Sequence, residues 1–375
     1  MKRRFVNISI VIFSTLYSLL RGSARKSIHP KSFVVVYGTN NIGDMVCVTP
    51  VFCAIKEHNP QSHITVLCSK KSMELLAHNA DIDECVDIAQ PVTSLIRILR
   101  KKNIDAGVAI NLDAIELGML FLGNVQSISC YSLTSSFRGY EARPYRVVSK
   151  YAHCVEYFPG KYIPEQHLKL LTPFGIHSND ATKHLAFSKE TSAEISTKLA
   201  EQHIHDSERV IAIAPGAGSD LKRWPAHRFA EVANHLYKKF NTPIIIVGGT
   251  SDVRAINEMV SALDVNVRYW CPGAQSMNEL KATLARAVLV IGNDSGAIHV
   301  AEAVGAKTIT IAGATDVDEH MRESNGHCIV RGEGEGIKYQ SYIGDESKMD
   351  PQLARAQMES IPVSIVLQEF CGLIT

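Results

Sequence analysis

The sequence alternates short apolar runs with amphipathic stretches, first from residue 32 and then again from residue 209. The runs FVVVY at 33–37 and VIAIA at 210–214 are typical of parallel strands buried on both faces. Strand–helix alternation produces parallel sheets with right-handed crossovers. At 375 residues and 46% hydrophobic content, the chain can form two cores. We therefore predict an α/β protein of two Rossmann-like, doubly wound lobes that face a central cleft.

The expected lobes span residues 32–175 and 176–345, with a turn-rich stretch at 171–180 between them. Residues 346–375 should close the structure as one or two helices. Ligands of open α/β sheets bind at the carboxyl ends of the strands. The strands expected are 33–37, 64–68, 85–88, 106–110 and 125–131, then 210–214, 243–247, 267–270, 288–291 and 307–311.

Residues 1–31 differ from the rest, because they contain seven Lys or Arg and no acidic residue. Their apolar run at 5–20 would reach about 24 Å as a helix, short of the ~30 Å hydrocarbon core. We expect this segment to lie in the interface of an anionic membrane, with packing on the protein's own surface as the alternative. The net charge of the whole chain, +1, indicates no nucleic-acid partner.

The nine cysteines are scattered singly, without a Cys-x-x-Cys pair, which argues against a zinc site and is typical of a reducing cytoplasm. His227, Glu231 and His235 share one face of the helix expected after residue 225. That face is opposite the helix's apolar stripe, so we interpret it as solvated surface rather than a metal site.

The loop at 38–44, GTNNIGD, follows the first strand. Its Gly-x4-Gly spacing resembles a phosphate-binding loop, but Asp44 and Met45 stand where Lys and Ser or Thr are required. A carboxylate would repel phosphates. Asp44 is therefore either a helix cap or a general base facing the cleft.

Two loops in the second half, PGAGSDLKRWP at 215–225 and GGTSD at 248–252, also follow expected strands. Gly216 lets the backbone approach a ligand, and Lys222 with Arg223 offers positive charge ahead of a helix. Leu221 occupies the third glycine position of a dinucleotide fingerprint, which argues against NAD. Asp252 could bind a ribose or cap the next helix.

The loop at 292–299, GNDSGAIH, precedes another helix. The backbone amides of Ser295, Gly296 and Ala297 would form an anion-binding nest at its start. His299, one turn further on, would as a lone histidine more often be structural.

Together these motifs resemble glycosyltransferase family 9, the lipopolysaccharide heptosyltransferase family, over roughly residues 32–370. Two segments, at 111–114 and 312–317, depart from the family pattern. The matching elements are Ile42-Gly43-Asp44, Thr49-Pro50, Pro215-Gly216-Ala217, Lys222-Arg223-Trp224-Pro225, Asn293-Asp294-Ser295-Gly296-Ala297-Ile298-His299, and the closing Met358, Ile361 and Val366.

The resemblance implies a GT-B fold and an inverting transfer that needs no metal and no cofactor, with a nucleotide sugar as co-substrate. The donor expected is ADP-heptose, and the acceptor a lipopolysaccharide core or another cell-envelope glycan. The acceptor would bind the first lobe and the donor the second. Such an enzyme would be cytoplasmic and peripheral on the inner membrane.

The resemblance also implies roles for individual residues. Asp44 would deprotonate the acceptor hydroxyl. The expected acceptor-binding residues are Thr39, Asn40 and Asn41, and the expected donor-binding residues are Gly216, Lys222, Arg223, Ser251, Asp252, Asp294, Ser295, Gly296, Ala297 and His299.

Three other classes stay open on the sequence alone. One is a family 9 transferase that uses another nucleotide sugar. The second is a Rossmann oxidoreductase or nucleotide-sugar epimerase, and the third is a non-catalytic sugar-nucleotide-binding protein.

Overall fold

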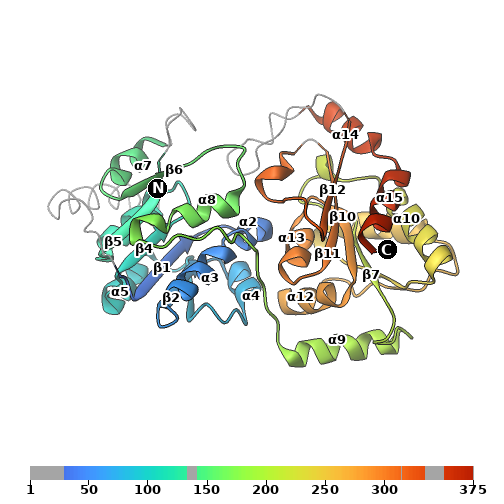
Figure 1. The fold of residues 1–375 in the computed structure, drawn as a ribbon, viewed down its shortest axis with the longest axis horizontal. Helices are drawn as coiled ribbons and strands as arrows, with labels where there is room; N and C mark the ends of the chain where they lie inside the picture. The colour runs from blue at the N-terminus through green and yellow to red at the C-terminus, as the bar shows by residue number, and fades with distance from the viewer. Residues whose placement is uncertain (1–28, 133–141, 314, 334–349, 375) are drawn as a thin grey trace. The chain divides into compact units, whose positions relative to one another are not determined.

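The computed structural model describes residues 29–132, 142–313, 315–333 and 350–374 (Figure 1). The predicted membrane-associating segment therefore lies, except for its last three residues, outside the described residues. Within those residues, no helix has both the length and the apolar character needed to cross a membrane.

The chain forms two compact units. The first contains the described residues up to Asn40, together with Cys47–Met73 and Ala80–Thr182. The second contains the described residues from Lys183 on, and it includes two short segments from the first half of the sequence, Asn41–Val46 and Glu74–Asn79. The segment that carries Asp44 is therefore part of the second unit.

The first unit is built on a parallel sheet in the order β3-β2-β1-β4-β5-β6, which is the strand order of a Rossmann fold (Figure 1). Val34 and Val36 of its central strand pack in a core with Leu95, Leu99 and other side chains of the flanking helices. The strands are β1 (Ser32–Tyr37), β2 (His63–Cys68), β3 (Glu84–Asp87), β4 (Ala106–Ala109), β5 (Ser127–Ser132) and β6 (His153–Glu156), and the helices are α3 (Thr49–His58), α4 (Lys70–Leu76, whose last three residues belong to the second unit), α5 (Val92–Lys102), α6 (Ala114–Leu122), α7 (Ala142–Ser149), α8 (Ile163–Lys169) and the 3-10 turn η1 (Thr172–Phe174).

The second unit has the same topology, with the sheet order β12-β11-β10-β7-β8-β9. Each unit therefore places its first and fourth strands side by side at the centre, β1 beside β4 and β7 beside β10. The strands are β7 (Ile211–Ala214), β8 (Ile244–Ile246), β9 (Tyr269–Trp270), β10 (Leu289–Asn293), β11 (Lys307–Ala312) and β12 (His327–Arg331).

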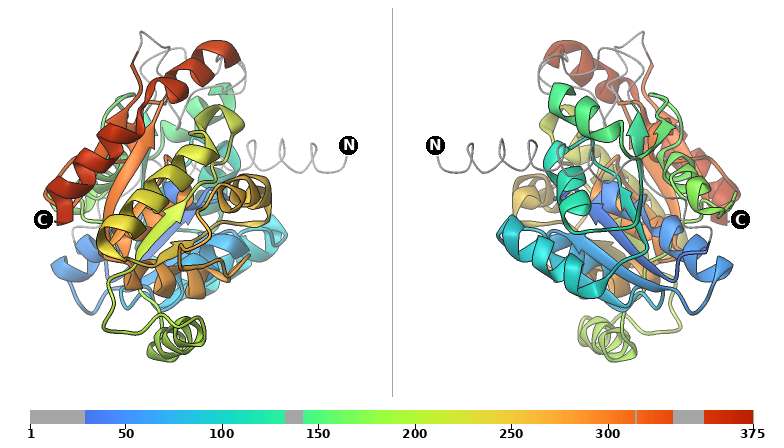
Figure 2. Two further views of the ribbon diagram at one scale, coloured as in Figure 1. Left: turned by 90° about the vertical axis from the view of Figure 1, so that its right-hand side faces the viewer. Right: turned by 90° about the vertical axis from the view of Figure 1, so that its left-hand side faces the viewer.

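The helices of the second unit surround this sheet, and α15 packs beside β11 and β12 (Figure 2). The apolar stripe predicted on α10 is buried at Phe229, Val232, Ala233 and Leu236, whereas Phe240 at its end is 40% exposed. The helices are α2 (Ile42–Val46), α9 (Lys189–Glu201), α10 (Ala226–Phe240), α11 (Val253–Ser261), α12 (Met277–Arg286), α13 (Gly296–Ala303), α14 (Pro351–Ser360) and α15 (Val363–Ile374), with 3-10 turns η2 (Asp220–Lys222), η3 (Thr250–Asp252) and η4 (Val317–Glu319).

The predicted fold class is confirmed, since both sheets are parallel and doubly wound. The prediction missed two of the four edge strands, β6 and β12, and the helices α2, α4, α7, α8 and α9. β6 alternates half-buried and exposed residues, so it has no continuous apolar run. In α9 the buried apolar side chains are Ile195 and Leu199, too few to give a clear stripe.

Candidate active site

The carboxyl ends of β7 and β10 meet at the centre of the second sheet. Asn293, the last residue of β10, is buried, and its amide holds both ends of the loop that follows β7. Its Nδ2 donates to the carbonyls of Pro215 (2.8 Å) and Gly216 (3.2 Å), and its Oδ1 accepts from the backbone N–H of Trp224 (2.9 Å). The loop is thus fixed to the edge of the sheet where ligands of this fold bind.

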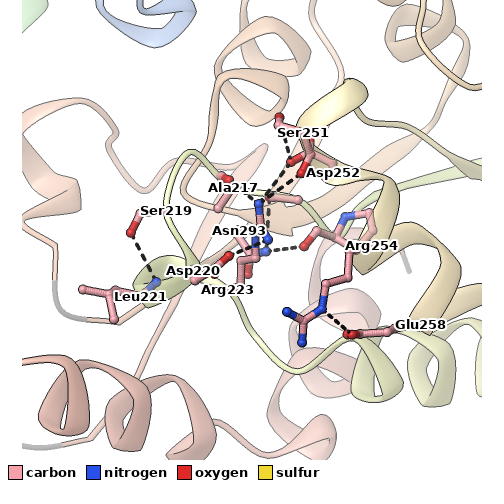
Figure 3. Close-up of polar contacts among 12 residues, drawn as sticks. Ala217, Ser219, Asp220, Leu221, Arg223, Ser251, Asp252, Arg254, Glu258 and Asn293 are labelled. Carbon is pink, nitrogen blue, oxygen red and sulfur yellow. Dashed lines mark hydrogen bonds and ion pairs between the residues drawn. The ribbon is translucent and has the colours of Figure 1, made fainter.

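Arg223 connects this loop to the turn after β8 (Figure 3). Its guanidinium donates to Asp220 (2.6 Å) and to the carbonyl of Ala217 (3.0 Å), and it lies 3.6 Å from the carboxylate of Asp252. The carbonyl of Ser251 is 3.5 Å away. Arg223 therefore already has anionic partners within the protein.

Asp252 acts as a cap in the structure, because its Oδ2 accepts from the backbone N–H of Gly249 (2.9 Å). Asp252 also explains why residue 216 is a glycine, since a Cβ on Gly216 would lie 2.2 Å from the Asp252 carboxyl carbon. A glycine is thus required for contact with Asp252. Ser251 is exposed beside it.

Lys222 and Asp294 form the charged centre of the site. The Lys222 ammonium lies 3.6 Å from Oδ2 of Asp294, which also accepts from the hydroxyl of Thr315 (3.1 Å). The other carboxylate oxygen lies 3.6 Å from Nε2 of His299. Burial raises the pKa of Asp294, but the hydrogen bond with His299 and the charge of Lys222 outweigh it, so the pKa lies well below its usual range. Asp294 is therefore a carboxylate at neutral pH.

His299 is buried next to this carboxylate on α13. Burial lowers the pKa of His299, and the nearby Asp294 opposes that shift only in part. The imidazole is therefore neutral near pH 7. Within the described part of the chain, its Nδ1 makes no hydrogen bond.

The first turn of α13 begins at Gly296, with Ser295 as the residue before it. Ser295 makes no side-chain capping bond, and Ser295, Gly296 and Ala297 are half-buried. Unlike a capped helix, this end leaves its amides to other acceptors, and the helix dipole favours an anion there.

Asp44 on α2 lies against α13 in the same unit, where a Cβ on Gly43 would come within 2.5 Å of the His299 ring. Its Oδ1 is 3.2 Å from Nε2 of His320, and its Oδ2 accepts from Nδ2 of Asn41 (2.9 Å). Burial raises the pKa of Asp44, but the hydrogen bond and charge of His320 and the bond from Asn41 outweigh it, and the net pKa is lowered.

The rings of His320 and His299 lie 5.7 Å apart between centroids. Asp44, His320, His299 and Asp294 therefore form one row, which we call the Asp–His row. The sequence predicted three of its members and missed His320. The only signal for His320 was its place just after the segment at 312–317 that departs from the family pattern.

The two remaining predicted residues, Thr39 and Asn40, belong to the first unit. The carbonyl of Thr39 accepts from the hydroxyls of Ser69 (2.8 Å) and Ser72 (3.1 Å), and Asn40 is exposed. These bonds hold the loop after β1 to the start of α4.

Glu116 on α6, which the sequence analysis missed, binds the same loop. Its Oε1 accepts from the backbone N–H of Gly38 (3.1 Å) and from Nδ2 of Asn111 (2.9 Å), while its Oε2 has no hydrogen-bond partner among the described residues. Burial raises the pKa of Glu116 to about 7, although its two hydrogen bonds oppose the shift.

His227, Glu231 and His235 are exposed, as expected of a solvated surface. Across the described residues, no three His, Cys, Asp or Glu side chains come close enough to hold a metal ion together.

The two Rossmann-like lobes define a protein of the GT-B fold. The family model described as "Glycosyltransferase family 9 (heptosyltransferase)" matches residues 121–336, more than half of the chain. The chain belongs to glycosyltransferase family 9, and it is a glycosyltransferase.

Similar proteins agree with this assignment. Lipopolysaccharide heptosyltransferase 3 of Escherichia coli (strain K12) is 26% identical over 286 residues, which is 73% of this chain and 80% of the relative. A family 9 glycosyltransferase from Veillonella parvula DSM 2008 has a TM-score of 0.73 at 18% identity, covering 94% of this chain and all of the other. The structure of E. coli ADP-heptose lps heptosyltransferase II has a TM-score of 0.71 at 19% identity, covering 91% and 98%. At these identities the two structures show a common fold.

Proposed function

We propose that the protein transfers heptose from ADP-heptose to a lipopolysaccharide-core acceptor, with inversion and without a metal ion. The relatives named above support the substrates. The observation that supports the chemistry is the Asp–His row, because it brings a carboxylate, Asp44, into one partly buried group with Lys222 and the first turn of α13.

In this proposal Asp44 takes the proton of an acceptor hydroxyl as the oxygen attacks the anomeric carbon of the donor. The bond between that carbon and the phosphate oxygen breaks on the opposite side, and ADP leaves. The negative charge that develops on the phosphate oxygen of ADP is stabilised by Lys222 and by the backbone amides of Ser295, Gly296 and Ala297. Asp294, kept ionised by its neighbours, would accept hydrogen bonds from hydroxyls of the donor sugar.

The other expected site residues have more limited parts. Arg223 and Asp252 hold the loops around the nucleotide, and Gly216 permits their contact. Thr39, Asn40 and Asn41 would contact the acceptor, with Asn41 also orienting Asp44.

Asp44→Asn tests the proposal. It keeps the size of the side chain and removes the base, so we expect kcat to fall by about 10²–10⁴-fold while ADP binding is retained. Transfer is measured with ADP-heptose and lipopolysaccharide truncated in its inner core, with EDTA present, and NMR of the product gives its anomeric configuration. Near-normal transfer by Asp44→Asn would remove Asp44 from this role.

Asp318→Asn is a matched control, because Asp318 lies on η4 close in sequence to His320 but pairs with Arg331 (2.6 Å). It should transfer normally. Thermal stabilisation by ADP-, UDP- and GDP-sugars tests the donor, since a ligand that binds only the folded state raises its stability. Stabilisation by UDP- or GDP-sugars alone would point to another donor, and binding without transfer to a non-catalytic protein.

We also propose that the enzyme works on the cytoplasmic face of the inner membrane, anchored peripherally by residues 1–31. The support is the seven basic and no acidic residues in that segment. Co-sedimentation with phosphatidylglycerol vesicles, compared with phosphatidylcholine vesicles, tests it. Replacing the seven basic residues by Gln should abolish any preference for the anionic lipid.

A further inference from the structure

His320 contacts Asp44 from a different part of the fold. Asp44 lies on α2, whereas His320 follows η4 in the connection between β11 and β12. The backbone carbonyl of His320 accepts from the ammonium of Lys183, which is itself paired with Glu302 of α13 (2.7 Å). The backbone of His320 is therefore anchored by groups outside the segment that carries Asp44.

We infer that His320 is a positioning residue for Asp44, and that it sets the lowest pH at which Asp44 can accept a proton from the acceptor. The inference rests on the proposed function, in which Asp44 is the general base. It adds a residue that neither the motifs nor the family match assigned.

His320 and Asn41 hold the Asp44 carboxylate from two sides. Nε2 of His320 lies 3.2 Å from Oδ1 of Asp44, and Nδ2 of Asn41 lies 2.9 Å from Oδ2. Among the described residues each carboxylate oxygen has one side-chain partner, so the carboxylate is fixed in orientation and keeps a lone pair that can receive a proton. The side chain of His320 is 6% exposed and that of Asp44 is 17% exposed, so water screens their interaction weakly.

Several charged or titratable groups face His320 from the surrounding elements. Asp44 lies on α2, and the ring of His299 on α13 lies next to the ring of His320 at an interplanar angle of 55°, with Asp294 on its other side. Lys183 binds its carbonyl, and the neighbouring Glu319 is buried. Lys222 lies beyond Asp294.

His320 also lowers the pKa of Asp44. Burial raises this pKa, and the hydrogen bond and charge of His320 are the largest opposing contributions, with Asn41 and His299 smaller. Removing His320 leaves burial less opposed, so the pKa of Asp44 rises. A general base acts only when deprotonated, so kcat/KM falls at low pH, in what we call the acid limb of its pH profile. This acid limb must move to higher pH when the pKa of Asp44 rises.

Two substitutions separate the hydrogen bond from the charge. His320→Gln keeps a donor but cannot become charged, whereas His320→Leu removes both. We expect the acid limb to move up by about one pH unit for Leu, which is about a tenfold loss of kcat/KM below the limb, and by less for Gln. ADP-induced thermal stabilisation shows whether each variant is folded. If His320→Leu does not fold, the shift of His320→Gln decides the question alone.

The matched control is His327→Gln. His327 is a half-buried histidine on β12 whose Nδ1 lies 3.0 Å from the hydroxyl of Thr308, away from Asp44. This variant also loses an imidazole and a hydrogen bond, but its acid limb should stay at the wild-type pH. A purely structural role for His320 would lower kcat without moving the limb, and that result would overturn the inference.

Failure of the inference can be told apart from failure of the proposed function. Titrating the Asp44 carboxyl carbon by NMR, in protein labelled with ¹³C-aspartate, compares the variants without turnover. Asp44→Asn that keeps its transfer activity refutes the general-base role. Loss of transfer in Asp44→Asn, with an unmoved Asp44 titration in folded His320 variants, refutes the inference alone.

Discussion

The two lobes share a strand order but differ at the point where their first and fourth strands meet. In the first unit, Glu116 on the helix after β4 accepts a hydrogen bond from Gly38 at the end of β1. In the second, Asn293 at the end of β10 donates to Pro215 and Gly216 after β7. Each lobe thus binds the loop of its first strand with a side chain that follows or ends its fourth strand.

Near each of these points lies a partly buried carboxyl group, Glu116 in the first lobe and Asp294 in the second, and the pKa values of the two groups are shifted in opposite directions. Burial raises the pKa of Glu116 to about 7, because its partners are the neutral amides of Asn111 and Gly38. Burial acts on Asp294 in the same sense, but His299 and Lys222 reverse the net shift. The fold therefore supplies the position, and the neighbouring side chains decide the charge.

Among the predictions that compare the two lobes, the largest effect is expected when the Lys222 ammonium beside Asp294 is removed. In Lys222→Met we expect kcat/KM to fall by about 10²–10³-fold, because the charge of the leaving diphosphate loses a partner. The pKa of Asp294 should rise in the same variant. Steady-state kinetics and calorimetric ADP binding measure the loss.

Lys198→Met is the control for that experiment. Lys198 is on α9 of the same unit and pairs with Glu279 (2.6 Å), so its loss should leave kinetics and ADP affinity unchanged. Equal losses in the two variants would mean that Lys222 acts only through the net charge of the protein and not through contact with the diphosphate.

A second prediction concerns the pH dependence of stability in the first lobe. The folded-state pKa of Glu116 is raised to about 7 from 4.5. Its contribution to stability is therefore fully present below about pH 4.5 and is lost as the pH rises through 7. Glu116→Gln cannot ionise, so the wild type should lose about 3 kcal/mol relative to this variant between pH 4.5 and pH 8. Urea unfolding at both pH values measures the difference.

Asp83→Asn gives the opposite sign in the same unit. Burial raises the pKa of Asp83, but hydrogen bonds from the backbone of Ile64 and from Lys56, with the charge of Lys56, lower it overall. Its stabilisation is present above about pH 4 and is lost on acidification. The same pH trend in Glu116→Gln and Asp83→Asn would mean that the pKa of Glu116 is not raised. The pKa values of Glu116 and Asp294 would then not be shifted in opposite directions.

Much of the fold was predictable because its central strands are buried on both faces. Continuous apolar runs mark them in any sequence context, as β1 and β10 show. The edge strand β6 is covered less completely and lacks that signal. The topology then follows from strand–helix alternation.

Residues of the candidate site were predictable only where they belong to a sequence motif that follows a strand. Lys222, Asp294 and His299 come together because the carboxyl ends of β7 and β10 are adjacent. Glu116 begins as an ordinary acid in the first turn of a helix, and its contact with Gly38 spans 78 positions in sequence. Composition also cannot distinguish an arginine that binds a ligand from one that joins two loops, as Arg223 does with Asp220 and Asp252.

The smallest effects are expected on the free energy of unfolding, when the N-terminal residues of the helices that follow the fourth strands are replaced. Asp113 caps α6 by accepting from the backbone N–H groups of Ile115 (2.6 Å) and Glu116 (3.0 Å), whereas Ser295 makes no side-chain cap on α13. Asp113→Ala should therefore lower the free energy of unfolding by about 1 kcal/mol, and Ser295→Ala by less than about 0.5 kcal/mol. Asp350→Ala, which removes the cap of α14 in the second unit, should resemble Asp113→Ala. Equal losses at all three positions in urea unfolding would mean that Ser295 caps α13 after all, leaving fewer amides there for a phosphate.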